Sequence, residues 1–124
     1  MDILTHAIMG ASLATAVASF RSGAENSAPA GRRGAVAVAG AVAGVLPDAD
    51  ALIQSGGDAL LVLDYHRHFS HALAFVPFGA LIAVLLLWPF LKRRIGFATL
   101  YACSFAAYLA HPLLDGCTSY GTHL

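Results

Sequence analysis

The chain has 124 residues, of which 58% are hydrophobic and 11% are charged. Soluble domains carry roughly a quarter charged residues, so the composition excludes an ordinary soluble surface, and it excludes intrinsic disorder as well. Seven basic residues balance seven acidic ones, and without a basic excess we expect no nucleic-acid partner. The length fits one domain, residues 1–124, which we expect to be embedded in the lipid bilayer.

Four apolar stretches predict an all-α integral membrane bundle of about four transmembrane helices. A helix that crosses a bilayer needs about 20 mostly apolar residues. The predicted spans cover approximately residues 3–20, 34–46, 71–91 and 95–114. The first span has an alternative interpretation as a signal peptide, because Ala16, Val17 and Ala18 resemble a cleavage site. A signal peptide begins with basic residues, whereas only Asp2 precedes this apolar run, so we expect a retained helix.

The second span is short and rich in small residues. Gly40 and Gly44 stand four residues apart, a spacing that lets helix backbones approach closely. We therefore expect this helix inside the bundle, with a re-entrant or buried segment as the alternative. It should end at Leu46, because Pro47 disfavours helical geometry in the residue before it.

The third span is the clearest transmembrane helix. Residues 72–91 contain no ionisable side chain, and Trp88 and Phe90 precede three basic residues. Aromatic and basic residues together are typical of the headgroup layer.

The distribution of charge predicts the orientation of the bundle. Loops that retain Lys and Arg face the cytoplasm, and six of the seven basic residues fall in the first and third loops: Arg21, Arg32, Arg33, Lys92, Arg93 and Arg94. Both termini then lie outside the cytoplasm. The outer side receives six of the seven acids, namely Asp2, Asp48, Asp50, Asp58, Asp64 and Asp115.

The same topology places five histidines near the outer ends of the spans. These are His6, His66, His68, His71 and His111. Ionisable groups within a membrane protein are costly and usually functional, so we expect a polar site at the non-cytoplasmic face.

Two carboxylates follow the second span. Asp48 and Asp50 lie close together and repel each other unless a cation or a proton lies between them. The alternative is a solvated turn that ends the helix.

A histidine-rich segment precedes the third span. Imidazole is the commonest metal ligand at physiological pH, and we take His66 and His71 as ligands and His68 as a surface or supporting residue. Arg67 suits phosphate or carboxylate, and it could equally pair with Asp64.

His111 and Asp115 end the fourth span. Residues four apart share a helix face, so both can bind one ion if the helix continues through Pro112. Alternatively, Asp115 accepts a hydrogen bond from the second nitrogen of a ligating histidine. Gly116 offers a helix stop.

Together these residues predict a metal site. The candidate ligands are His6, Asp48, Asp50, His66, His71, His111 and Asp115. Three carboxylates exceed the charge of one divalent ion, so we expect two or more metals, zinc first, with Mn²⁺ or Fe²⁺ as alternatives. Paired metals activate water and clamp phosphoester oxygens. We therefore expect hydrolysis of a phosphoester, in a lipid or an envelope precursor, with Asp48, Asp50 and Arg67 in catalysis.

Four motifs resemble the YdjM-like family of membrane-bound metal-dependent hydrolases. They are residues 2–6 (DILTH), 44–50 (GVLPDAD), 66–71 (HRHFSH) and 111–115 (HPLLD), the last followed by residues 118–122 (TSYGT). The resemblance implies a protein of the inner membrane and the same ligand set, with Arg67 beside it. Members of the family usually continue with further hydrophobic helices, so we expect a C-terminally truncated or minimal member.

Two other functions remain open at this stage. A metal could merely hold the helices together, or the polar residues could form a transit site for a divalent cation or a proton. Transport needs polar groups at several depths, and the cytoplasmic halves of the spans have few. The substrate and the oligomeric state are not predicted.

Overall fold

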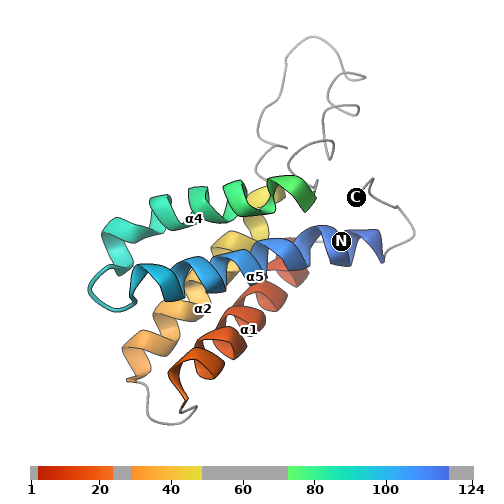
Figure 1. Cartoon of the computed structure of the whole chain (residues 1–124). Helices are drawn as coiled ribbons and strands as arrows, with labels where there is room; N and C mark the ends of the chain where they lie inside the picture. The colour runs from red at the N-terminus through yellow and green to blue at the C-terminus, as the bar shows by residue number, and fades with distance from the viewer. Residues whose placement is uncertain (1–2, 24–28, 49–72, 118–124) are drawn as a thin grey trace.

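The computed structural model describes residues 3–23, 29–48 and 73–117. Of these residues 91% are helical, and none of them forms a strand. The elements are α1 (Ile3–Ser22), α2 (Ala30–Val45), the short 3-10 helix η2 (Leu73–Phe75), α4 (Val76–Leu91) and α5 (Phe97–Gly116), as Figure 1 shows. The prediction of an all-α bundle with about four long helices is confirmed.

Three of the described helical segments are long and apolar enough to cross a membrane. They are Ile3–Arg21, Leu73–Leu91 and Phe97–Gly116, and they match the predicted first, third and fourth spans within a few residues. The second helix, α2, has 16 residues, fewer than a full crossing needs. Its buried residues are Ala35, Val36, Ala39, Gly40, Ala43 and Gly44.

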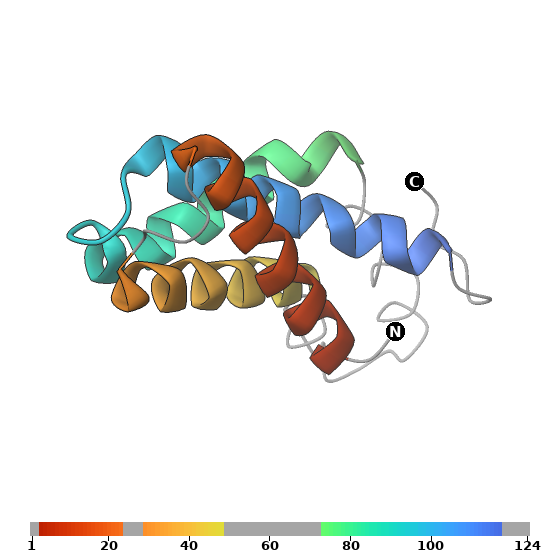
Figure 2. The same cartoon turned by 90° about the horizontal axis from the view of Figure 1, so that it is seen from below.

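Glycine allows α1 and α2 to pack with their backbones in contact. A Cβ added to Gly10 would overlap the carbonyl oxygen of Gly40, and one added to Gly40 would overlap Ala14. A Cβ added to Gly44 would lie 2.6 Å from the carbonyl oxygen of His6. The small-residue spacing in the second span therefore allows the close backbone approach that the sequence predicts. Helix α1 crosses α2 obliquely at this contact (Figure 2).

The ends of two helices differ from expectation. Leu46 keeps right-handed helical dihedrals (φ −56°, ψ −36°) although Pro47 follows it. Residues 46–48 continue the helix as a 3-10 turn. Pro47 therefore changes the type of helix at this end and does not force Leu46 into an extended conformation. At the other end, α2 begins at Ala30 after Pro29. Arg32 and Arg33 therefore lie in its first turn and not in a loop.

The third long helix also begins later than predicted. Residues 73–75 are a 3-10 turn, and α4 proper begins at Val76 with Pro77 in its first turn. Proline is favoured there because its missing N–H would have no partner within the helix. The α4–α5 turn, with Lys92, Arg93 and Arg94, lies where the sequence predicts it.

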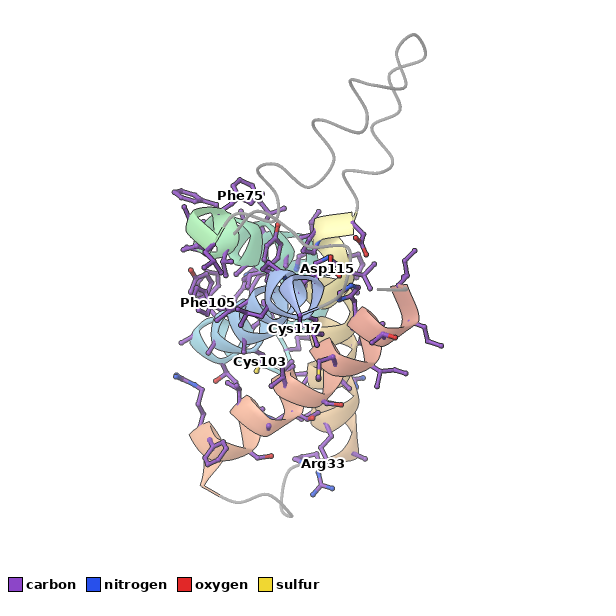
Figure 3. All side chains as sticks on the ribbon, turned by 90° about the vertical axis from the view of Figure 1, so that its right-hand side faces the viewer. Arg33, Phe75, Cys103, Phe105, Asp115 and Cys117 are labelled. Carbon is purple, nitrogen blue, oxygen red and sulfur yellow. The ribbon has the colours of Figure 1, made fainter. Side chains whose placement is uncertain are left out.

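The bundle has two chemically different ends. The end of α1, the start of α2 and the α4–α5 turn lie together at the left in Figure 1, and they carry all six basic residues that the structure describes. The start of α1 and the ends of α2 and α5 lie at the opposite end. Figure 3 looks at that end, with Asp115 between α2 and α5, and Arg33 at the lower end of α2.

Candidate metal centre

Two histidines from helices distant in sequence stack at one end of the bundle. His6 in α1 and His111 in α5 have ring centroids 3.7 Å apart and ring planes inclined by 19°. The side chains are buried, with residue exposures of 2% and 1%. Farther along the same pair of helices, the thiol of Cys103 donates to the carbonyl oxygen of Ala14 at 3.3 Å, which helps to hold α1 and α5 in this register.

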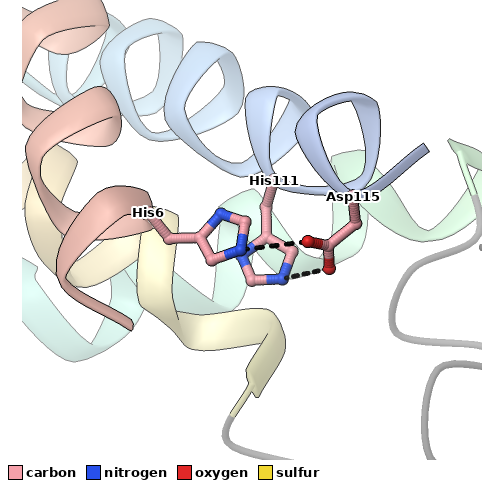
Figure 4. A group of neighbouring side chains, drawn as sticks. All are labelled: His6, His111 and Asp115. Atoms are coloured by element: carbon pink, nitrogen blue, oxygen red, sulfur yellow. Dashed lines mark ion pairs between the residues drawn. The ribbon is translucent and has the colours of Figure 1, made fainter. Parts of the chain in front are cut away.

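Asp115 joins both imidazoles from one helical turn beyond His111. One carboxylate oxygen, Oδ1, lies 3.2 Å from Nε2 of His6, and the other, Oδ2, lies 3.5 Å from Nε2 of His111 (Figure 4). The α-helix continues through Pro112, which is the condition under which the sequence predicts that His111 and Asp115 share an ion. Asp115 is itself 3% exposed.

Asp48 approaches the same histidine from the 3-10 turn after α2. Its Oδ1 lies 3.3 Å from Nε2 of His111, and its side chain is 24% exposed. The ends of three helices thus meet at this site. Asp48 is the most accessible of the four side chains.

The backbone of α2 fixes the orientation of the His111 ring. Nδ1 of His111 lies 2.6 Å from the carbonyl oxygen of Gly44, which can only accept a hydrogen bond, so Nδ1 carries the proton. The other nitrogen, Nε2, then faces the carboxylates of Asp48 and Asp115. A ligating histidine commonly donates its second N–H to a backbone carbonyl in this way.

The buried imidazole of His6 provides a test of whether a cation suits the site. Neither ring nitrogen of His6 makes a hydrogen bond within the described part of the chain, although Nε2 lies 3.2 Å from Asp115. An unsatisfied buried polar group costs about 1–3 kcal/mol. A cation between Nε2 and the carboxylate would satisfy that nitrogen, so the arrangement fits a bound metal.

The distances between donor atoms point the same way. One ligand atom from each of His6, His111 and Asp115 lies within 4.8 Å of the other two. Asp115 presents one carboxylate oxygen to each imidazole, Oδ1 to His6 and Oδ2 to His111. Two imidazoles and a carboxylate are also donors that zinc accepts.

The structure brings together four of the predicted site residues, His6, Asp48, His111 and Asp115. The other four, Asp50, His66, Arg67 and His71, lie outside the described residues. Sequence reasoning missed the role of the Gly44 carbonyl. The spacing of Gly40 and Gly44 predicts close helix packing at this point. It does not predict that the carbonyl oxygen of Gly44 accepts a hydrogen bond from His111.

Comparison of the sequence with models of protein families identifies the family of this chain. The model of the YdjM inner membrane protein family matches residues 1–124, the whole chain. The chain belongs to the YdjM inner membrane protein family. No curated protein and no solved structure matches it. The resemblance found in the sequence motifs is thereby confirmed, and membership of the family agrees with the long apolar helices of the chain.

Proposed function

We propose that this YdjM family member is a metal-dependent hydrolase of the inner membrane that acts on a phosphoester of a lipid or an envelope precursor. The proposal is carried by one observation, the buried group of His6, His111 and Asp115 with Asp48 at its edge. Three ligand-competent side chains from two helices converge, and one imidazole lacks any hydrogen bond among the described residues.

Each side chain has a distinct task in this proposal. His6, His111 and Asp115 would hold a divalent metal, zinc first, with Mn²⁺ or Fe²⁺ as alternatives. When bound, such a metal polarises a phosphoryl oxygen and lowers the pKa of a coordinated water. Asp48 is partly exposed and lies beside the group, so its carboxylate can accept a proton from an attacking water.

The complete site contains more than the described residues. We assign Asp50, His66 and His71 to a second metal and Arg67 to the phosphate of the substrate, on the basis of their donor chemistry. With Asp48 kept as the base, two acids and four histidines remain as ligands, which exceeds the needs of one ion. The proposal therefore calls for two or more metals per chain.

The charge of the bundle supports a non-cytoplasmic site. Arg21, Arg32 and Arg33 lie at the end away from His6, as do the basic residues of the α4–α5 turn. Basic residues at span ends stay on the cytoplasmic side. The site and both termini then face outward, where membrane lipids and envelope precursors supply phosphoesters.

A structural metal is the second candidate function, and one observation favours it. The four side chains come from three helix ends, so a metal there would fasten α1, α2 and α5 even without chemistry. Structural sites are closed by protein ligands, whereas catalytic sites keep a position for water. The partial exposure of Asp48 supports the catalytic alternative.

The test is hydrolysis of a panel of phosphoesters by the detergent-purified chain with zinc or manganese. We expect turnover that is abolished in Asp115→Asn, which loses a metal ligand. Asp48→Asn should lose at least 100-fold in rate, the low end of the range for general acid–base catalysis, while it retains metal. Cys117→Ser, an exposed change at the end of α5, is the matched control and should keep full activity.

The outcomes separate the two functions. Metal binding without hydrolysis of any phosphoester, together with loss of thermal stability in Asp115→Asn, would favour the structural metal. Full activity in Asp115→Asn would contradict both.

A further inference from the structure

The end of the bundle opposite the metal centre concentrates positive charge. Six basic residues gather there from three segments: Arg21, Arg32, Arg33, Lys92, Arg93 and Arg94. We call these six residues the basic end. Among the described residues the carboxylates belong to Asp48 and Asp115, and both lie at the metal centre. The positive charge of the described residues is therefore concentrated at the end of the bundle away from these two carboxylates.

One of these cations is held in place by the fold. Nη1 of Arg94, in the α4–α5 turn, donates to the carbonyl oxygen of Gly31 at 3.2 Å. The bond spans 63 residues of sequence and links the turn to the first turn of α2, which also carries Arg32 and Arg33. The guanidinium keeps further N–H groups for another acceptor, because arginine has five donors.

The depth of the basic end in the membrane is set by the helices that carry it. Arg21 is the last residue of one candidate span, and Lys92 directly follows another. Large aromatic side chains lie at the same level: Phe20 and Phe90 are exposed, and the ring of Trp88 packs edge-on against Phe97 at 5.3 Å. Aromatic rings and basic residues at one level mark the headgroup layer.

We propose that the basic end is a binding surface for the headgroup of an anionic phospholipid, with Arg94 as its fixed anchor beside Arg32 and Arg33. The position of these side chains at the ends of the apolar spans places them at the headgroup layer. This depth in the membrane favours a lipid of the bilayer over a dissolved anion. Each basic side chain near a membrane surface contributes about 1 kcal/mol of attraction to anionic lipid. The inference is independent of the proposed function, since it involves none of the metal-centre residues.

Glycine provides an unusually clean way to test the role of Arg94. A Cβ added to Gly31 would lie 2.8 Å from Nη1 of Arg94, the far end of a flexible side chain. Gly31→Ala therefore moves the guanidinium without changing any charge. Gly34→Ala, also in α2, meets nothing within 4 Å and is the matched control.

Trp88 provides the readout, because it is the only tryptophan of the chain and its carbonyl oxygen accepts the N–H of Lys92. The full chain is reconstituted in phosphatidylcholine with brominated phosphatidylglycerol, or in phosphatidylglycerol with brominated phosphatidylcholine. The two quenching curves give the relative affinity of the anionic and neutral lipids near Trp88.

We expect phosphatidylglycerol to be preferred at least fivefold in the wild type and in Gly34→Ala. The preference should fall about fivefold in Arg94→Gln, the factor for one basic side chain, and it should fall in Gly31→Ala as well. Thermal unfolding of each variant confirms that it is folded. Equal quenching by the two lipids in the wild type, or an unchanged preference in folded Arg94→Gln, would overturn the proposal. Loss of the preference in millimolar inorganic phosphate at constant ionic strength would also overturn it, because the partner would then be a dissolved anion.

Discussion

The carbonyl oxygen of Gly44 accepts a hydrogen bond from Nδ1 of His111 over 2.6 Å, and the Cα side of the same glycine faces the backbone of His6. A single residue of α2 thus orients one imidazole and sets the position of the helix that carries the other. Close helix packing and the geometry of the candidate metal centre are therefore coupled at one position.

Gly44→Ala should disturb the metal centre without touching a ligand. Its Cβ would lie 2.6 Å from the carbonyl oxygen of His6, so α1 and α2 must separate and the two imidazoles must shift. Overpacking of this kind costs about 1–3 kcal/mol of stability. We expect a lower midpoint of thermal unfolding in detergent and weaker zinc binding by titration calorimetry.

The control for this change lies on the same helix. Gly34→Ala adds the same methyl group where no atom lies within 4 Å, and alanine is the better helix former. Its unfolding midpoint should equal or exceed that of the wild type. If both variants bind zinc as tightly as the wild type, Gly44 does not position the site.

Removal of metal should destabilise the wild-type chain. A ligand that binds only the folded state at 100 times its dissociation constant adds about 2.7 kcal/mol of stability. We expect a chelator to lower the unfolding midpoint of the wild type by several degrees and to leave that of Asp115→Asn unchanged, as followed by circular dichroism. An equal response in both proteins would show that Asp115 holds no stabilising ion.

Gly79→Ala should loosen the contact between α4 and α5. The ring of Tyr108, which is buried, occupies the space that a Cβ at Gly79 would need. The ring and the α5 backbone must move, at a cost of about 1–3 kcal/mol. Because Tyr108 lies one turn before His111, we expect weaker zinc binding as well as a lower unfolding midpoint. An unfolding midpoint equal to that of Gly34→Ala would contradict this packing.

Ser104→Ala should be neutral or stabilising, unlike most changes in a buried position. The hydroxyl of Ser104 is fully buried and has no hydrogen-bond partner within the described residues. Removing a buried polar group without a partner relieves a cost of about 1–3 kcal/mol. The unfolding midpoint measures the outcome, and a clear decrease would mean that the hydroxyl has a partner.

Much of the fold follows from apolar run length. The stretches around α1, α4 and α5 contain long sequences without charge, so the bilayer requirement alone locates them within a few residues. The start of α2 was harder to predict, because the two charged residues Arg32 and Arg33 suggested a loop outside the membrane. In the structure their side chains leave the helix at the basic end, and Pro29 starts the helix before them.

Less of the candidate site than of the fold could be predicted from the sequence. The four-residue spacing of His111 and Asp115 places both on one helix face, and the charge distribution places His6 at the same end. Sequence does not reveal which atoms face each other. The stacking of His6 on His111 and the bond to Gly44 depend on the crossing of α1 over α2, which is set by packing.

The most direct test of the metal centre is the metal content of the detergent-purified chain, measured by elemental analysis. The wild type and Cys117→Ser should carry two or more equivalents of zinc or manganese, and His6→Ala, His111→Ala and Asp115→Asn should each lose metal while remaining folded. Absence of metal from the wild type, or equal metal in all five proteins, would contradict the account.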